Sequence, residues 1–476
     1  MKNMTQDIFS LYAISPVDGR YFQKTKELGM YFSESALIYY RFIVELKYLM
    51  YLGENGIISI TEDEQKLLQE ILHEHKHEKQ ILLRVGLAVK DLEKTTNHDV
   101  KAVEYYLNQI LDRKALGHLK RFVHIGLTSE DVTSNAHALS DAMFLNDVAI
   151  PIMKKLYGIL DSGAKKYAAV PMMSMTHGQP ATPTTCGKEV RIYAKQIADI
   201  LTALRNVSAY GKCNGSSGNR NAHQTAFPHV NWQKFSTKFI EEFLPKGLIL
   251  KRSYVRVKAN SLTNQIEPHL GRVEMFQIFS RLMSIVRNIS WDCWHYVSRF
   301  ILTQAVVATE TGSSTMPHKV NPINFENAIG NARLAQFTLQ GLSSELPVST
   351  MQRDLVDSTM QRAVGPAFGH VLIALKSLMT GLEKVYPNEN QMLKELNDNP
   401  ALLAEAIQTI LRRTGEIEKP YEALRDFTRR ESGSITHESL KTFIEELPIS
   451  KETKEELLCL KVSDYVGDAE YHARFH

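Results

Sequence analysis

The sequence contains few cysteines and no long apolar run, and both shortages narrow the class of protein. Four of its 476 residues are cysteine, and no two of them form a CxxC pair. A disulfide framework and a zinc cluster are therefore excluded as expectations, and reduced thiols in the cytoplasm are the default. No uninterrupted apolar stretch reaches the roughly eighteen residues that a transmembrane helix needs. The N-terminal stretch contains Asp7 and lacks a continuous apolar core, so no secretory signal is expected.

Excess charge of one sign is also missing. The formal net charge is +3, with 23% charged and 43% hydrophobic residues. This balance is typical of an ordinary globular protein and does not indicate a nucleic-acid-binding surface. Internal repeats and low-complexity tracts are absent from the sequence. A chain of this length is too long for one compact core, so several domains are expected.

Alternating strand patterns are scarce, whereas helical periodicity is present along most of the chain. Apolar residues recur in steps of four and three at Val190, Ala194, Ile197, Leu201 and Leu204. This spacing predicts a helix with a narrow, coiled-coil-like seam. We therefore expect an all-α fold without a major sheet.

The segment that starts at Val273 shows the same periodicity over about thirty residues, which as a helix would span roughly 45 Å. Apolar side chains occupy more than one stripe of this segment, and such a helix is buried on several sides. Shorter helices are expected near residues 32–52 and 62–73, and prolines break the C-terminal helices. We predict three helical domains: residues 1–118, a central long-helix bundle over 119–370, and residues 371–476.

One polar stretch, residues 312–322, reads GSSTMPHKVNP and follows a long segment without glycine or proline. Pro317 and Pro322 exclude the interior of a helix or of a central strand. A polar loop at the end of a long rigid element is a place where catalytic groups are found. This loop is therefore the first candidate for a functional site.

Three other polar breaks flank the predicted long helices. Residues 128–131 (TSED) precede a helix, and the simplest interpretation of this motif is an N-cap. Residues 176–183 (THGQPATP) place His177 in a loop before the seam helix, where a single histidine is more often structural than catalytic. Residues 265–269 (QIEPH) precede the longest helix. Each signal is weak alone, but a helical bundle can bring its polar ends together.

The motifs TSED, THGQPATP and GSSTMPHKVNP occur in the order found in the fumarase/aspartase superfamily, and the chain resembles that superfamily over most of its length. Residues 15–21 (SPVDGRY), 95–105 (TTNHDVKAVEY) and 352–362 (QRDLVDSTMQR) are similar to the adenylosuccinate lyases within it. The resemblance implies β-elimination of fumarate from adenylosuccinate, leaving AMP. It also implies release of fumarate from the succinyl-carboxamide ribotide SAICAR, leaving AICAR.

The resemblance assigns roles to the polar residues of the loops. Ser313 would be the base that removes the proton next to a carboxylate, and His177 the acid that protonates the departing nitrogen. Glu326 would orient this histidine. Lys319 and Asn321 would stabilise the charge that develops on the carboxylate.

The remaining assignments concern substrate binding. The residues implied to hold the succinyl carboxylates are Thr128, Ser129 and Gln265. Those implied to hold the nucleotide portion are Arg20, Tyr21, Asn97, His98 and Asp99. Guanidinium and hydroxyl groups suited to a phosphate come from Arg20, Arg353, Arg362 and Ser358. The stretch 214–219 (NGSSGN) would line the pocket with backbone, although Ser216 and Ser217 replace the alanine and valine usual in the family.

The resemblance implies no cofactor and no metal. It implies a homotetramer in which the long helices form the central bundle and each active site combines residues from three subunits. We expect nucleotide substrates as the partners, and neither nucleic acid nor a membrane.

Three alternatives remain. Residues 73–77 (HEHKH) match the HExxH zinc motif formally, but a strongly polar helix end is the simpler interpretation. A sister lyase acting on argininosuccinate, fumarate or aspartate would not need the arginines suited to a phosphate. An inactive relative serving as a structural protein is disfavoured because Ser313, His177, Lys319 and Glu326 are all present.

Overall fold

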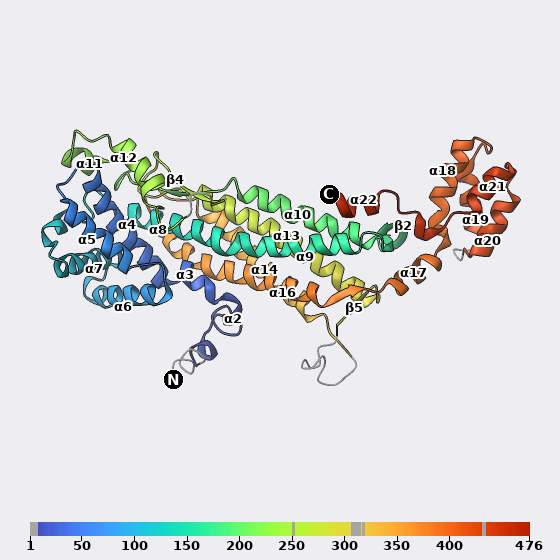
Figure 1. The fold of residues 1–476 in the computed structure, drawn as a ribbon, viewed down its shortest axis with the longest axis horizontal. Helices are drawn as coiled ribbons and strands as arrows, with labels where there is room; N and C mark the ends of the chain where they lie inside the picture. The colour runs from blue at the N-terminus through green and yellow to red at the C-terminus, as the bar shows by residue number, and fades with distance from the viewer. Residues whose placement is uncertain (1–7, 250–252, 306–315, 317–318, 431–434) are drawn as a thin grey trace. The chain divides into compact units, whose positions relative to one another are not determined.

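The computed structural model describes residues 8–249, 253–305, 316, 319–430 and 435–476 (Figure 1). Within these residues the regular elements are helices apart from six short strands, which confirms the all-α fold class. The long predicted helices are present. The seam segment lies in α10 (Cys186–Leu204), and the thirty-residue segment is α13 (Leu270–Ser298). The two shorter N-terminal helices are α4 (Glu34–Glu54) and α5 (Glu62–Glu74).

The chain forms two compact units, each built from separate segments. Unit 1 contains the described residues up to Lys154, Ile200–Val286 and Ala328–Lys376. Unit 2 contains Lys155–Asp199, Arg287–Asn327 and the described residues from Ser377 on. The chain passes between the units inside five long helices, α9 (Ile150–Lys166), α10, α13, α14 (Ile323–Glu345) and α16 (Val364–Glu383). The three domains predicted from the sequence, with boundaries at residues 118 and 370, stay a prediction.

Helix α4 is the centre of unit 1. Ser33 caps its N-terminus by accepting a hydrogen bond from the Ala36 backbone N–H, 3.1 Å away. Every residue from Ile38 to Leu52 is buried, so α4 is enclosed on all sides. Helices α6 (Lys79–Thr96), α7 (Asp99–Arg113) and α8 (Ser129–Phe144) pack against it (Figure 1).

The other elements of unit 1 are short. They are α2 (Phe22–Thr25), η1 (Lys26–Leu28), α3 (Gly29–Phe32), η2 (Gly117–Phe122), η3 (Leu145–Ala149), β3 (Ser208–Gly211), α11 (Asn221–Ala226), α12 (Trp232–Lys238), η4 (Phe239–Phe243), β4 (Arg256–Ala259), α15 (Val356–Met360) and η5 (Gln361–Ala363). Strands β3 and β4 pair in parallel, and β3 packs on α8.

An aromatic cluster joins distant segments of unit 1. The ring of Phe368 on α16 lies 4.6 Å from that of Phe144, 5.0 Å from that of Phe279 and 5.4 Å from that of Phe32, measured between centroids. Phe368 is fully buried. Its side chain therefore holds α3, α8, α13 and α16 together.

Phe368→Ala is expected to lower the free energy of unfolding by about 3–5 kcal/mol, because the cavity left behind is lined by rigid rings. Urea unfolding followed by circular dichroism measures this change. Phe475→Ala, at a position that is 70% exposed, serves as the control and should change stability by less than about 0.5 kcal/mol. Equal stability of the two variants would show that the cluster does not support unit 1.

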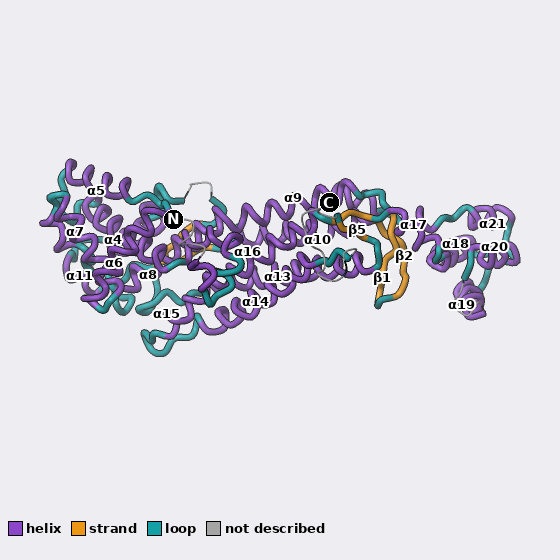
Figure 2. The backbone as a smooth tube through the Cα atoms, turned by 90° about the horizontal axis from the view of Figure 1, so that it is seen from below, coloured by secondary structure: helices purple, strands orange, loops and turns teal. Residues whose placement is uncertain are grey.

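Unit 2 contains the minor hairpin that the sequence pattern did not reveal. Strands β1 (Pro171–Thr176) and β2 (Gln179–Thr185) pair antiparallel, and β5 (Leu302–Gln304) pairs with β6 (Val385–Pro387) (Figure 2). The other elements of unit 2 are α17 (Glu389–Asn397), η6 (Pro400–Leu403), α18 (Ala404–Thr414), α19 (Pro420–Arg430), α20 (His437–Glu446), α21 (Lys451–Leu458), η7 (Val462–Asp464) and α22 (Ala469–Phe475).

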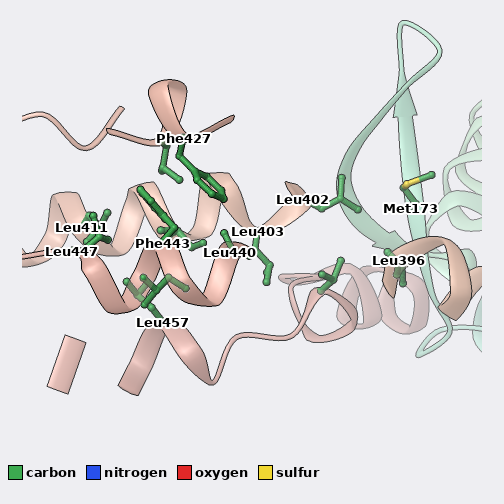
Figure 3. Packing of buried hydrophobic residues seen from close by; sticks show 14 residues of the cluster. Met173, Leu396, Leu402, Leu403, Leu411, Phe427, Leu440, Phe443, Leu447 and Leu457 are labelled. Atoms are coloured by element: carbon green, nitrogen blue, oxygen red, sulfur yellow. The ribbon is translucent and has the colours of Figure 1, made fainter. Parts of the chain in front are cut away.

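The core of unit 2 connects the hairpin with the C-terminal helices. Met173 of β1 belongs to one buried cluster with Leu396, Leu402 and residues of α18 to α21 (Figure 3). Within this cluster the rings of Phe427 and Phe443 stack with centroids 4.4 Å apart. The cluster anchors the hairpin through one of its strands.

The zinc motif at residues 73–77 is not formed on one helix face, because α5 ends at Glu74. His75 is buried, and its Nδ1 lies 2.7 Å from the Ile71 carbonyl oxygen. His77 Nε2 lies 2.9 Å from the Tyr40 hydroxyl. The interpretation of residues 73–77 as a strongly polar helix end is wrong for His75, because this side chain is buried. The described residues contain no cluster of three or more metal-ligating side chains.

Among the described residues, one helical stretch is long and apolar enough to cross a membrane. It is Val356–Glu383, with a mean hydropathy of 1.3, and 67% of its apolar window is buried inside the protein. This burial is what a core helix shows. All four cysteines are free thiols.

Candidate active site

The N-terminus of α8 is the first element of the candidate site. Thr128 is its N-cap, and the Thr128 backbone N–H donates to the Asp131 carboxylate over 2.9 Å. The predicted N-cap is therefore confirmed. Backbone N–H groups of a first helical turn attract anions, and Thr128 and Ser129 are half-buried here. The position suits a carboxylate of a substrate.

A glycine-rich loop lies against this helix end. The backbone N–H groups of Asn214 and Gly215 donate to the Asp131 carboxylate at 3.0 Å each. Gly215 has a φ of +79°, which favours glycine. The Gln265 side chain donates to the Ser216 carbonyl oxygen at 3.1 Å. Three predicted carboxylate-binding residues, Thr128, Ser129 and Gln265, are thus linked within unit 1.

Arg353 lies in the same network. Its guanidinium donates to Asp357 at 2.9 Å and to Glu130 at 3.2 Å. Burial raises the pKa of Glu130, although the Arg353 charge opposes this shift. Burial also acts to raise the pKa of Asp357, but the hydrogen bond from His269 and the Arg353 charge outweigh it and hold this pKa below its ordinary value. Arg353 is therefore fixed by carboxylates in this structure.

A cavity of about 230 Å³ in unit 1 contains two of the residues predicted to bind phosphate, Ser358 and Arg362. Ser358 is half-buried, and Arg362 is exposed, with its guanidinium 3.5 Å from Glu34. Arg41 and Arg272 line the same cavity. The cavity thus combines guanidinium and hydroxyl groups.

The turn between α6 and α7 carries Asn97, His98 and Asp99. Asn97 ends α6 with a φ of +49°, and His98 caps α7 by accepting from the Lys101 backbone N–H at 3.2 Å. Asp99 accepts a hydrogen bond from Arg41 over 2.7 Å. Burial acts to raise the pKa of Asp99, but the charge and hydrogen bond of Arg41 hold it below its ordinary value.

Arg41 connects this turn with the α8 region, because its Nε donates to the Thr133 hydroxyl at 3.1 Å. Asn97 and His98 remain exposed. Asp99 is therefore joined to the helix that begins with the predicted carboxylate site, whereas the other two side chains face solvent.

Arg20 and Tyr21 follow a tight turn in which the Gly19 and Tyr21 N–H groups donate to the carbonyls of Ser15 and Pro16, both at 2.9 Å. Arg20 is exposed. Within the described residues, no hydrogen bond or ion pair joins Arg20 to the other predicted site residues of unit 1.

Unit 2 contains His177, the predicted general acid. His177 and Gly178 form the turn of the β1–β2 hairpin, with φ of +53° and +72°. Both residues take the left-handed conformation that a two-residue hairpin turn requires. The His177 side chain is exposed at the hairpin tip, where it is available to a substrate.

The polar loop of residues 312–322 is described only in part. Ser313 lies outside the described residues. Lys319 is exposed, Asn321 is half-buried, and the Lys319 backbone N–H donates to the Met316 carbonyl at 3.0 Å. Glu326, in the first turn of α14, accepts a hydrogen bond from the Trp294 indole over 3.1 Å. No hydrogen bond joins Glu326 to His177 within the described chain.

Sequence reasoning missed the buried charges behind the site. Arg41 and Arg272 line the cavity, and the Asp131–Lys212 pair lies under the α8 N-terminus. Asp131 belongs to the TSED motif, which could have singled it out. Lys212 stands next to the glycine-rich stretch, but no sequence signal indicates that a lysine there is fully buried.

His223 lies beneath the same loops. It is 1% exposed, and neither ring nitrogen has a hydrogen-bond partner among the described residues. Its ring packs on Trp232, 4.7 Å between centroids, and it touches Gly126, where an added Cβ would come within 2.9 Å. Burial lowers the pKa of His223 to about 4.

The depressed pKa of His223 predicts that the protein loses stability as the pH falls from about 6.5 to about 4. In this window the unfolded chain binds a proton on His223 that the folded chain does not. The full loss amounts to about 3 kcal/mol, at roughly 1.4 kcal/mol per pH unit. Urea midpoints of the wild type and His223→Phe between pH 7 and 4.5 measure it. The variant should show a shallower decline, and parallel declines would refute the contribution of His223.

Comparisons with known proteins identify the family of this chain. Two family profiles match: one described as lyase over residues 19–336 and one described as adenylosuccinate lyase C-terminal over residues 349–466. The adenylosuccinate lyase of Dictyostelium discoideum is 39% identical over 469 residues, which cover 96% of this chain and 97% of the relative. That of Escherichia coli K12 is 39% identical over 468 residues, covering 97% and 98%. That of Legionella pneumophila (strain Corby) is 41% identical over 466 residues, covering 96% and 97%.

Solved structures share the fold. The crystal structure of a fumarate lyase from Mesorhizobium sp. BNC1 superposes with a TM-score of 0.70 at 16% identity, covering 95% of this chain and 96% of that one. The 3-carboxy-cis,cis-muconate lactonizing enzyme from Pseudomonas putida gives 0.68 at 17% identity, covering 98% and 97%.

The helical fold and the lyase profile define a fumarase/aspartase-type lyase. The chain is about 40% identical to adenylosuccinate lyases over nearly its whole length, which identifies the family within this class of lyases. The chain belongs to the adenylosuccinate lyase family, whose members are carbon–nitrogen lyases.

Proposed function

We propose that this chain eliminates fumarate from adenylosuccinate, leaving AMP, and from SAICAR, leaving AICAR. The observation that carries the proposal is the identity of 39–41% to adenylosuccinate lyases over nearly the full length. Both reactions break a C–N bond by β-elimination, and both substrates carry a succinyl group and a phosphate.

The chemistry requires a base, an acid and fixed positive charge. Ser313 removes the proton next to a succinyl carboxylate, and His177 donates a proton to the departing nitrogen. Glu326 orients His177. Lys319 and Asn321 stabilise the charge that develops on the carboxylate as the proton leaves. The exposure of His177, Lys319 and Glu326 supports these roles, because each side chain is available to a substrate or a partner subunit.

Unit 1 supplies the binding groups. The α8 N-terminus with Thr128 and Ser129, together with Gln265, holds the succinyl carboxylates. The nucleotide portion is held by Arg20, Tyr21, Asn97, His98 and Asp99, and the phosphate by Arg353, Ser358 and Arg362. The linked hydrogen bonds of the α8 N-terminus, Gln265 and Arg353 support this division, as does the arginine-lined cavity.

The active enzyme is a homotetramer in which three subunits build each site. No hydrogen bond joins His177 to Glu326 within the described residues. This is consistent with a pairing of the two side chains between subunits. The enzyme works in the cytoplasm without cofactor or metal, and its four free thiols are consistent with a reducing compartment.

A substrate panel tests the proposal. Fumarate release is measured with adenylosuccinate, SAICAR, argininosuccinate and malate, and with the adenylosuccinate analogue that lacks the phosphate. We expect turnover of the first two and a much higher KM for the phosphate-free analogue. Fumarate formed from argininosuccinate or malate alone would instead assign the chain to a sister activity.

A further inference from the structure

A fully buried ion pair lies directly behind the predicted carboxylate-binding end of the site. Lys212 Nζ is 2.6 Å from Asp131 Oδ1, and both side chains are 0% exposed. Neither group can therefore touch a substrate. Burying two charges is costly unless further hydrogen bonds satisfy them, so the bonds that this pair makes show what it holds in place.

Asp131 uses both carboxylate oxygens to hold backbone. Oδ2 accepts from the Thr128 N–H at 2.9 Å and from the Gly215 N–H at 3.0 Å, and Oδ1 accepts from the Asn214 N–H at 3.0 Å. Lys212 also donates to the Gly215 carbonyl oxygen at 3.2 Å. One ion pair thus joins the N-cap of α8 to the glycine-rich loop.

The same loop fixes Gln265. The Gln265 amide donates to the Ser216 carbonyl oxygen, and the Asn214 side chain donates to the Thr263 hydroxyl at 2.9 Å. A Cβ on Gly218 would lie 1.8 Å from the Thr263 carbonyl oxygen, so the two segments are in direct contact. A shift of the loop would therefore move Gln265 relative to Thr128.

The charge balance of the pair matters as much as its bonds. An unpaired carboxylate at Asp131 would sit three residues from the helix end that binds the anion, where it would repel a dicarboxylate. Lys212 balances this charge through its ion pair with Asp131. The positive field of the helix end is preserved.

We propose that Asp131 and Lys212 are positioning residues that set the geometry of the dicarboxylate-binding end of the active site. The inference rests on the proposed function, because it takes Thr128, Ser129 and Gln265 as the groups that hold the succinyl carboxylates. It predicts selectivity: disrupting the pair weakens binding of the dicarboxylate product, fumarate, and spares the nucleotide product, AMP.

Lys212→Met tests the proposal with two inhibitors. We expect KM for adenylosuccinate and Ki for fumarate to rise about tenfold or more, as for loss of hydrogen bonds to a charged group. Ki for AMP should change by less than about threefold. Lys47→Met is the matched control, since Lys47 is also a buried lysine in unit 1 but donates to the carbonyls of Leu244 and Lys246. The control should leave both inhibition constants near their wild-type values.

The double variant Asp131→Asn/Lys212→Met separates positioning from stability. It contains no unpaired buried charge, so it should recover much of the stability that Lys212→Met loses. The amide nitrogen of the introduced asparagine cannot accept a hydrogen bond, so the Thr128 N–H, which donates to Oδ2, and the Asn214 N–H, which donates to Oδ1, cannot both be satisfied. Fumarate binding should therefore stay weak. Recovery of fumarate binding together with stability would reduce the pair to a structural role and overturn the proposal.

Calorimetric titration with fumarate makes the two proposals distinguishable. If the wild type binds fumarate, Lys212→Met does not, and adenylosuccinate is not turned over, the proposed function fails while the positioning role stands. Suppose that turnover is normal, but that Lys212→Met weakens the binding of fumarate and of AMP equally, or weakens the binding of neither. The positioning role is then wrong, and the proposed function stands. A wild type that binds no fumarate overturns the carboxylate site itself.

Discussion

Replacing His177 with alanine is expected to lower kcat about 10²–10⁴-fold, the range typical of a lost general acid. The departing nitrogen of the substrate is a poor leaving group unless it is protonated, and His177 projects from the hairpin tip, where it is exposed. Ser313→Ala should have at least as large an effect, because no elimination begins without the base. The double variant should fold and assemble but not turn over. Initial rates of fumarate release measure all three variants.

The control is His118→Ala, a half-exposed histidine whose ring nitrogen lies 3.0 Å from Glu64, in the N-terminal part of unit 1. Its kcat should stay near the wild-type value. Circular dichroism and sedimentation establish that the His177 and Ser313 variants remain folded and assembled. A double variant that retains a substantial share of the wild-type rate would contradict the assignment of acid and base.

Mixing inactive His177→Ala with inactive Ser313→Ala is expected to restore activity to about a quarter of the wild-type level after subunits exchange at random. The reason is that a site built from different subunits receives both intact residues in some mixed tetramers. The mixture is equilibrated under mild dissociating conditions, and fumarate release is then compared with that of each variant alone.

Exchange must be demonstrated independently, for example by differently tagged subunits that elute together. If exchange is complete and activity stays at the level of the single variants, His177 and Ser313 act within one subunit and the shared-site proposal is wrong. A mixture of the double variant with the wild type is the reference for dilution without complementation.

Much of the fold could be predicted from the sequence, because helical periodicity depends on neighbours three and four residues apart. The spacing from Val190 to Leu204 predicted α10, and the segment from Val273 predicted α13. Thr128 was predicted as an N-cap because capping is a local interaction. The β1–β2 hairpin was not predicted, since its strands are short and its sequence lacks alternation.

The candidate site was predictable only where a local motif marks it. The links that hold it together join residues that are distant in sequence, such as Arg41 with Asp99 and Lys212 with Asp131. The partner of a buried charge follows from the fold and not from neighbouring residues. For this reason the motifs indicated Thr128 and Gln265, whereas the network that positions them became visible in the structure. Ser313 lies outside the described residues, so its role stays a prediction.

The ultraviolet absorbance of the purified protein mixed with adenylosuccinate tests whether the chain is an adenylosuccinate lyase. We expect the spectrum to change toward that of AMP, with one fumarate released for each AMP formed. An unchanged adenylosuccinate spectrum, while the same preparation forms fumarate from argininosuccinate or malate, would contradict the nucleotide assignment. If the folded, assembled protein releases no fumarate from any of these substrates, the catalytic role is contradicted.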